Sequence, residues 1–217
     1  MDNKIPEIKR ANAGFFIAAA LLIVLDQATK LAVKGFDLFG IEYSGIGYGT
    51  HIPVIGDFLQ ITFIENEGMA FGISFGAWKI LLSLFSIFAG GFLGVILARL
   101  NRYSFWVQTG VMLIFAGAVG NLIDRVFYGL FYGYAPLFYG RVVDFVLVDI
   151  PDVSVFGLSY NYFPVFNVAD SCVTVGVAIL LIAHKHLPKW EQVLRPKSVP
   201  DDPAGNEIEQ KNPGMEK

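Results

Sequence analysis

Charged residues, cysteine and histidine are all scarce in this sequence of 217 residues. Only 16% of the residues are charged, against about 25% in typical soluble domains, and 54% are hydrophobic. The single cysteine excludes a disulfide framework and any multi-cysteine zinc or iron–sulfur site. The net charge of −3 lacks the basic excess that nucleic-acid binding needs, so we expect no nucleic-acid partner. The composition favours a membrane protein.

Four apolar runs are each close to the roughly 20 residues that cross about 30 Å of hydrocarbon. They cover residues 14–33, 78–100, 105–126 and 164–183. We predict four transmembrane helices, because a spanning segment must satisfy its own backbone hydrogen bonds in lipid. The first run follows cationic residues, as a cleaved signal peptide does, but it continues past Asp26 without a small-residue cleavage site. We expect it to be retained.

The segments between and beyond these runs differ in composition. Residues 35–77 and 127–163 are rich in glycine and aromatic residues, and the β-branched and aromatic stretch 57–64 predicts short strands. The expected fold is therefore an α-helical membrane protein with four transmembrane helices and a small β-rich outer (periplasmic) subdomain. Residues 1–13 form an N-terminal arm, residues 14–187 the membrane domain, and residues 188–217 a charged tail predicted to be disordered.

The distribution of lysine and arginine predicts the orientation. Eleven of the 16 lie in the N-terminal arm, in the turn between the second and third runs, or in the C-terminal end. The 35–77 connection contains none, and the 127–163 connection contains only Arg141. Under the positive-inside rule both termini are cytoplasmic and both long connections face outward.

Polar residues at membrane depth are candidates for a functional site, because each costs at least a few kcal/mol there unless it is paired or hydrated. They lie at the predicted outer ends of the helices or in the second connection: Asp26, Lys30, Asn121, Asp124, Arg125, Asp144, Asn167 and Asp170. Their spacing places Asn121 with Arg125, and Asn167 with Asp170, on shared helix faces. Spacing alone leaves two interpretations open, interhelical contacts or a reactive site.

The reactive side chains available in this sequence exclude most types of hydrolytic catalysis. His184 and His186 lie at the predicted cytoplasmic end, and His51 lies in the first outer connection. A serine–histidine catalytic pair would therefore lack a histidine base at the depth of the polar residues. Cys172 has no nearby base and is expected to be a buried thiol. Zinc would lack a sufficient ligand set, and we expect no metal or cofactor. Two carboxyl groups that share a proton around one water can hydrolyse a peptide bond, so aspartic chemistry remains.

Five ordered segments resemble those of lipoprotein signal peptidase (signal peptidase II), a bacterial family of aspartyl membrane peptidases. They are LDQATK (25–30), NEGMAF (66–71), GNLIDR (120–125), VVDF (142–145) and FNVADS (166–171). The resemblance implies that Asp144 and Asp170 form the catalytic dyad. It also implies a shell that holds the substrate backbone and orients the dyad: Asn66, Asn121, Arg125 and Asn167, supported by Asp26. Asp124 and Gly120 are expected to be structural.

The same resemblance implies a substrate and a location. The substrate would be a prolipoprotein whose cysteine carries diacylglycerol, cleaved on the amino side of that cysteine. The enzyme would act as a monomer among the lipids of the bacterial inner membrane. A small transporter and a non-catalytic lipid-binding protein are the alternatives from other classes.

Two segments are longer than the family pattern leads us to expect. Residues 127–140 separate Arg125 from the VVDF segment, and residues 149–160 separate Asp144 from the fourth run. The first combines glycine and proline with tyrosine and phenylalanine, a composition suited to a loop in the headgroup layer. We expect it to gate substrate entry, with an inert elongation as the alternative.

Overall fold

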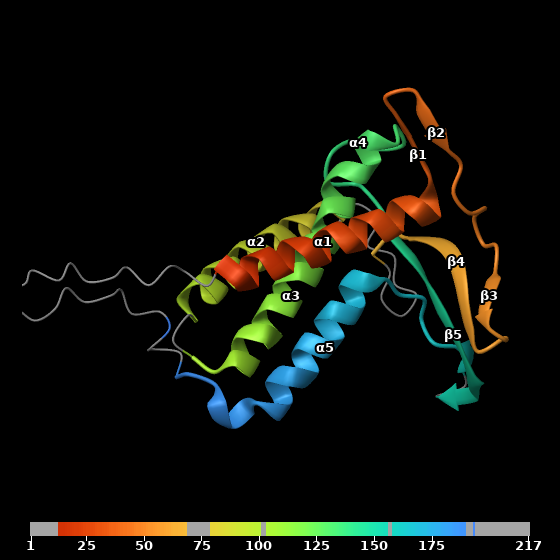
Figure 1. Ribbon diagram of the computed structural model, residues 1–217. Helices are drawn as coiled ribbons and strands as arrows, with labels where there is room; N and C mark the ends of the chain where they lie inside the picture. The colour runs from red at the N-terminus through yellow and green to blue at the C-terminus, as the bar shows by residue number, and fades with distance from the viewer. Residues whose placement is uncertain (1–12, 69–78, 101–102, 156–157, 190–192, 194–217) are drawn as a thin grey trace, which may run out of the picture. The chain divides into compact units, whose positions relative to one another are not determined.

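Four long helices follow the apolar runs of the sequence. The computed structural model describes residues 13–68, 79–100, 103–155, 158–189 and 193. The helices are α1 (Ala13–Lys34), α2 (Lys79–Arg99), α3 (Phe105–Ile123) and α5 (Val168–Ile182). They belong to the first of two units, residues 1–187 and 188–217, and α3 contacts the other three (Figure 1). The predicted N-terminal arm and most of the predicted tail lie outside the described residues.

Three of the helices are long and apolar enough to cross a membrane. These are α1, α2 and the helix that runs from Phe105 to Phe131. α5 has 15 residues, which span about 22 Å at about 1.5 Å per residue. It is shorter than the predicted run because Phe166 still pairs with Val146 of the sheet and the helix begins only after it. The helical membrane protein is confirmed, and a fourth span stays a prediction.

The third apolar helix extends beyond residue 126. α3 continues into a π-helical turn, η2 (Asp124–Tyr128), and a short helix, α4 (Gly129–Phe131). The prediction that the outer connection starts at residue 127 was therefore wrong, since residues 127–131 are helical. Glycine and aromatic residues have modest helix propensity, but a tertiary hydrogen bond from Tyr128 Oη to Gln27 Oε1 (3.0 Å) supports this turn.

Two small antiparallel sheets occupy the connections predicted to contain strands. β1 (Phe36–Leu38) pairs with β2 (Ile41–Tyr43). The second sheet has the order β3-β4-β5-β6, built from β3 (Ile52–Ile55), β4 (Leu59–Asn66), β5 (Val142–Val155) and β6 (Leu158–Tyr162). The strand predicted at residues 57–64 is β4, and the longer segment 149–160 contributes to the β5–β6 hairpin.

The sheet packs on one end of the helices through an apolar cluster. Its buried members are Val33 of α1, Phe63 of β4, Tyr128, and Val143 and Phe145 of β5. Successive side chains of a strand point to opposite faces, so Asp144, between Val143 and Phe145, points away from this cluster. The core packing therefore determines which way the Asp144 carboxyl group faces.

Candidate active site

The predicted site residues meet where helix ends approach strands β4 and β5. Asn66 ends β4, Asp144 lies on β5, and Asn167 caps α5 three residues before Asp170. Asn121 lies in the last turn of α3, and Asp124 begins the π-helical turn. These residues come from four separate segments, β4, β5, α5 and the helix formed by α3 and η2, so only the tertiary fold assembles them.

Asp144 is enclosed by hydrogen-bond donors. Its side chain is buried, with 3% of the residue exposed. Asn66 Nδ2 donates to its Oδ2 (3.1 Å) and Asn167 Nδ2 donates to its Oδ1 (2.7 Å). Burial, followed by repulsion from the Asp170 carboxylate, raises the pKa of Asp144 to about 7. Asp144 therefore keeps its proton up to near neutral pH, well above the range in which an ordinary aspartate ionises.

Asp170 is held in the first turn of α5 by a capping box. Its backbone N–H donates to Asn167 Oδ1 (2.9 Å), and the Asn167 backbone N–H donates to Asp170 Oδ2 (3.2 Å). This reciprocal pattern satisfies two backbone donors that a helix start leaves free. It also leaves Asp170 Oδ1 to accept from Asn121 Nδ2 (2.8 Å). The local sequence Asn-x-x-Asp thus begins the helix and positions a carboxylate at once.

Asn167 connects the two carboxyl groups. Its side-chain Nδ2 lies within hydrogen-bond distance of Asp144 Oδ1, Asn121 Oδ1 (3.1 Å) and the Val143 carbonyl oxygen (3.2 Å). Its backbone N–H reaches Asp170. Since Asn167 is fully buried, these contacts constrain both acids relative to each other.

A buried group of charges supports this network from α1. Lys30 Nζ lies 2.8 Å from Asp26 Oδ2, 2.8 Å from Asp124 Oδ2 and 2.9 Å from Asn121 Oδ1. An ammonium group has three protons to donate, and these three acceptors match them. Because Asn121 Oδ1 accepts from Lys30, its Nδ2 faces Asp170. Lys30 therefore determines the orientation of the Asn121 amide.

The sequence pointed to Lys30 as a candidate residue but not to its partners, and it did not indicate any role for Gln27. Gln27 Nε2 lies 2.9 Å from Asp124 Oδ1 and 3.1 Å from the Gly120 carbonyl oxygen. The spacing of four residues between Asp26 and Lys30 was the available signal for their ion pair. No local pattern pointed to these contacts of Gln27, because Gly120 and Asp124 are more than 90 residues away in sequence.

Asp26, Asp124 and Gly120 make contacts between the helices and strand β5. Asp26 Oδ1 accepts the backbone N–H of Ala169 at the start of α5 (2.9 Å), and Asp124 Oδ2 accepts that of Val143 (3.2 Å). A Cβ atom at Gly120 would lie 2.7 Å from Asp26 Oδ2. These contacts join α1, α3, α5 and β5 directly behind the two candidate catalytic acids.

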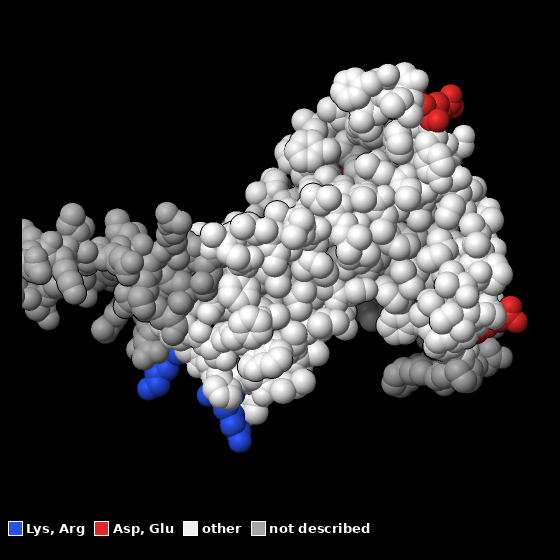
Figure 2. All heavy atoms as spheres, in the orientation of Figure 1, with Lys and Arg blue, Asp and Glu red and all other residues white. Residues whose placement is uncertain are grey.

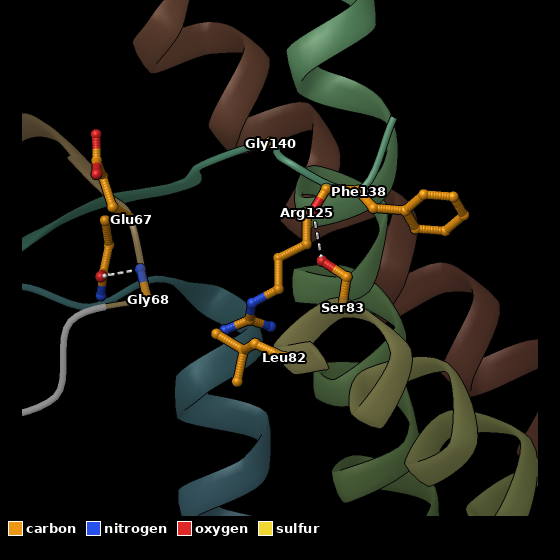
Figure 3. Close-up of a pocket in the computed structure, with 8 residues that line it drawn as sticks. Glu67, Gly68, Leu82, Ser83, Arg125, Phe138 and Gly140 are labelled. Carbon is orange, nitrogen blue, oxygen red and sulfur yellow. Dashed lines mark hydrogen bonds between the residues drawn. The ribbon is translucent and has the colours of Figure 1, made fainter. Parts of the chain in front are cut away.

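Arg125 and Asn66 line a small cavity between the end of β4 and α2 (Figure 3). It measures about 10 Å³, close to the space that one water molecule needs. The Arg125 side chain ends beside Leu82 of α2. Gly68, at φ +88°, donates its N–H to Asn66 Oδ1 (2.9 Å), which turns Asn66 Nδ2 toward Asp144. Gly68 therefore lies in a tight turn, at a φ value that favours glycine.

A larger, apolar cavity borders Asp170. Its volume is about 430 Å³, and it is lined mainly by apolar residues together with Asp170, Ser171 and Thr174: the others are Phe163, Pro164, Val165, Phe166 and Val175. Asp170 therefore lies between the asparagine network and an apolar space. Within the described ranges, no group of three or more histidine, cysteine, aspartate or glutamate residues has the geometry to hold a metal ion.

The fold and the site together define a helical membrane protein with two carboxyl groups joined by one asparagine at the sheet end of its helices. Residues 18–185 match the family model described as Signal peptidase (SPase) II. The chain belongs to the signal peptidase II family, and it is therefore a protease of the membrane. The resemblance predicted from the five segments is confirmed.

The similarity to individual members extends over most of the chain. The lipoprotein signal peptidase of Porphyromonas gingivalis strain W83 is 37% identical over 205 residues, which cover 82% of this chain and 86% of that protein. That of Chlorobium phaeobacteroides strain BS1 is 40% identical over 170 residues, covering 77% and 93%. A bacterial membrane enzyme solved by the in meso method at 1.9 Å resolution is 32% identical, with a TM-score of 0.58 over 80% of this chain and 93% of that one.

Proposed function

We propose that this protein is an aspartic endopeptidase that removes the signal peptide from prolipoproteins, with Asp144 and Asp170 as its dyad. Cleavage would fall on the amino side of a diacylglycerol-bearing cysteine. Membership of the signal peptidase II family, and relatives named lipoprotein signal peptidases, support the substrate class. The observation that carries the catalytic assignment is that one buried residue, Asn167, contacts both carboxyl groups.

The two acids can divide the work of hydrolysis. Asp170, as the carboxylate, would take a proton from a water molecule that attacks the scissile carbonyl carbon. Asp144, protonated because its pKa is about 7, would give its proton to the carbonyl oxygen. The tetrahedral intermediate then collapses and the C–N bond breaks, while Asp170 gives the proton it took from water to the leaving amine nitrogen. Asp144 takes back a proton from a hydroxyl group of the intermediate, which restores the starting protonation of both acids. Two close carboxyl groups sharing one proton suit this division.

The asparagines and Arg125 would form the positioning shell. Asn66 and Asn167 donate to Asp144, and Asn121 donates to Asp170. Donors held by their own partners keep their geometry during reaction, which is the basis of electrostatic preorganisation. Arg125 lies at the cavity beside Asn66 and Gly68, where it would bind the substrate backbone.

The apolar cavity beside Asp170 supports a lipid-modified substrate. Its phenylalanine, proline and valine lining suits acyl chains, and its edge reaches the proposed dyad through Asp170 and Ser171. We therefore place the diacylglyceryl group of the substrate cysteine on this side of α5. We propose that the protein acts as a monomer among membrane lipids.

The charge distribution supports an outward-facing site. Exposed Arg99 ends α2 and exposed Lys185 follows α5, whereas exposed Asp37 and Glu42 lie on β1 and β2 and Asp57 lies between β3 and β4. On the face that Figure 2 shows, the lysine and arginine side chains lie at the helix end of the molecule and the acidic side chains at the sheet end. Cytoplasmic segments of membrane proteins carry the excess of lysine and arginine. We propose that both termini are cytoplasmic and that the site lies near the outer face of the inner membrane.

The test is cleavage of a lipidated prolipoprotein by the purified protein, followed as a gel shift when the signal peptide is lost. Asp144→Asn and Asp170→Asn keep the shape of the side chain and remove the acid, so each should abolish cleavage while the protein remains folded. Asp57→Asn, the same change at an exposed acid of the β3–β4 turn, should retain full activity.

The outcomes separate the classes of function. Substantial cleavage by either dyad variant would refute the aspartic mechanism. A transporter or a non-catalytic lipid-binding protein would leave the prolipoprotein intact even with the unaltered protein. Loss of cleavage on chelation, with recovery on addition of zinc, would show metal-dependent chemistry instead.

A further inference from the structure

A second group of charged and aromatic residues lies on the other side of β4 and β5 from the dyad. This anchor cluster consists of Lys34 at the end of α1, Glu65 of β4, Arg141 just before β5, and Tyr132 and Tyr134 of the longer connection. None of these residues belongs to the five segments that resemble the peptidase family. The site described above gives them no role.

Lys34 is the centre of the anchor cluster. Its ammonium group pairs with the Glu65 carboxylate, and the two side chains are only 8% and 13% exposed. It also lies over three aromatic rings, 4.1 Å from the Tyr132 centroid, 5.0 Å from that of Tyr134 and 5.7 Å from that of Phe63. Cation–π contacts strengthen when the cation is desolvated. This lysine is therefore held on several sides.

Arg141 extends the cluster to the start of β5. Arg141 Nη1 lies 3.0 Å from Glu65 Oε2, and Nη2 lies 2.8 Å from Glu67 Oε1. The Arg141 backbone N–H donates to Tyr134 Oη (2.9 Å), and Tyr132 Oη donates to the Gly35 carbonyl oxygen (2.7 Å). Glu65 is thus shared between the end of α1 and the residue before β5. These contacts tie the longer connection down, which argues against its predicted role as a mobile gate.

The anchor cluster lies next to the contact between Asn66 and Asp144. Glu65 precedes Asn66, and in the β4–β5 register Glu65 lies opposite Val143 and Asn66 opposite Val142. Asn66 then donates to Asp144 Oδ2 across the strand pair. The ladder between the bulge and the end of β4 has only three aligned pairs, those of Ile64, Glu65 and Asn66. A short ladder beside a bulge needs another contact to keep its register.

We propose that Lys34 and Glu65 are positioning residues for the dyad: their ion pair, shared with Arg141, holds β4 against β5 so that Asn66 meets Asp144. This inference rests on the proposed function, because it assigns a catalytic consequence to the position of Asp144. The longer connection contributes Tyr132 and Tyr134 as the aromatic walls around Lys34. It therefore supports the active site instead of gating it.

The first test is Glu65→Gln, with Glu42→Gln on exposed strand β2 as the matched control. Glu65→Gln should lower kcat about 10-fold with KM changed less than about 2-fold, because small displacements of positioned groups cost rate more than binding. In an Asn66→Ala background the same change should have little further effect on kcat, since its consequence passes through Asn66. Glu42→Gln should leave both constants unchanged.

The second test uses Lys34. Lys34→Met should reproduce the loss in kcat, and Lys34→Arg should recover most of it, because a cation is restored to the same carboxylate and rings. Thermal unfolding of each variant shows whether the fold is intact at the assay temperature. Full kcat in a folded Glu65→Gln or Lys34→Met protein would overturn the proposal, and so would equal effects of Glu65→Gln with and without Asn66. Absence of cleavage by the unaltered protein would instead overturn the proposed function.

Discussion

Replacing Lys30 with methionine removes the cation from the buried charge group and leaves the rest of the side chain similar in length. The ammonium group is fully buried and has three acceptors at 2.8 to 2.9 Å, on Asp26, Asp124 and Asn121. Its loss leaves two carboxylates facing each other with only their remaining N–H donors. Breaking a buried ion pair by removing one partner costs about 3–5 kcal/mol. We expect the free energy of unfolding to fall by that amount.

The measurement is thermal unfolding in detergent, read by the loss of helical circular dichroism. For chains of this size about 1 kcal/mol shifts the midpoint by about 2–4 °C, so the expected drop is roughly 6–20 °C. Lys185→Met, the same change at an exposed lysine, should stay within about 0.5 kcal/mol. The double variant Lys30→Met with Asp124→Asn should recover part of the loss, because it removes one of the stranded carboxylates.

The result that would refute this reasoning is a Lys30→Met protein that unfolds no more easily than the Lys185→Met control. The buried carboxylates would then be stabilised without Lys30. A double variant less stable than Lys30→Met alone would also contradict the argument, because the cost would then come from lost hydrogen bonds and not from uncompensated charge.

Three further predictions concern pH, packing and orientation. Cleavage should fall as the pH rises through about 7, where Asp144 loses its proton. Because folding raises the pKa of Asp144 above the unfolded value of about 3.9, its carboxylate destabilises the fold at high pH, and Asp144→Asn should be more stable than the unaltered protein above pH 7. A cleavage rate and a stability difference that both stay constant with pH would contradict this prediction. Gly117→Ala places a Cβ against the Ala169 carbonyl oxygen and should lower the free energy of unfolding by about 1–3 kcal/mol. Gly91→Ala, whose Cβ would meet nothing within 4 Å, should leave it unchanged. Equal melting temperatures of the two variants would contradict this prediction. A reporter that is active only in the cytoplasm should be active when fused after Lys217, and a cysteine that replaces Gly47 should react with a membrane-impermeant reagent added from outside. The reverse pattern would show that the orientation is opposite to the one proposed.

The sequence allowed the helices to be predicted and the candidate site residues to be named, because long apolar runs and short polar motifs are local features. Long apolar runs can cross or enter a membrane only as helices, and α1, α2 and α3 follow the predicted ranges closely. The strand at residues 57–64 was predictable from its β-branched and aromatic content and appears as β4. The five polar segments identified the family and the acids that converge on Asn167.

Where the local pattern was weak, the tertiary contacts decided. Residues 127–131 were predicted as loop because their composition favours turns, yet the helix continues through a π-helical turn held by Tyr128 and Gln27. α5 starts later than its apolar run because residues before Asn167 pair with the sheet. The predicted gate is tied to α1 through Tyr132, an interaction between residues about 100 positions apart.

The sequence by itself determined the class of protein, the helical runs and the residue types that the chemistry requires, because hydrophobicity and motif order are properties of short segments. Only the tertiary structure decided which polar groups are partners. Lys30 contacts Asp124 and Asn121, which are more than 90 residues away in sequence, and Lys34 contacts Glu65 on β4 and two tyrosines of the longer connection. Burial makes each of these pairings costly to break, and burial exists only once the sheet has packed on the ends of the helices.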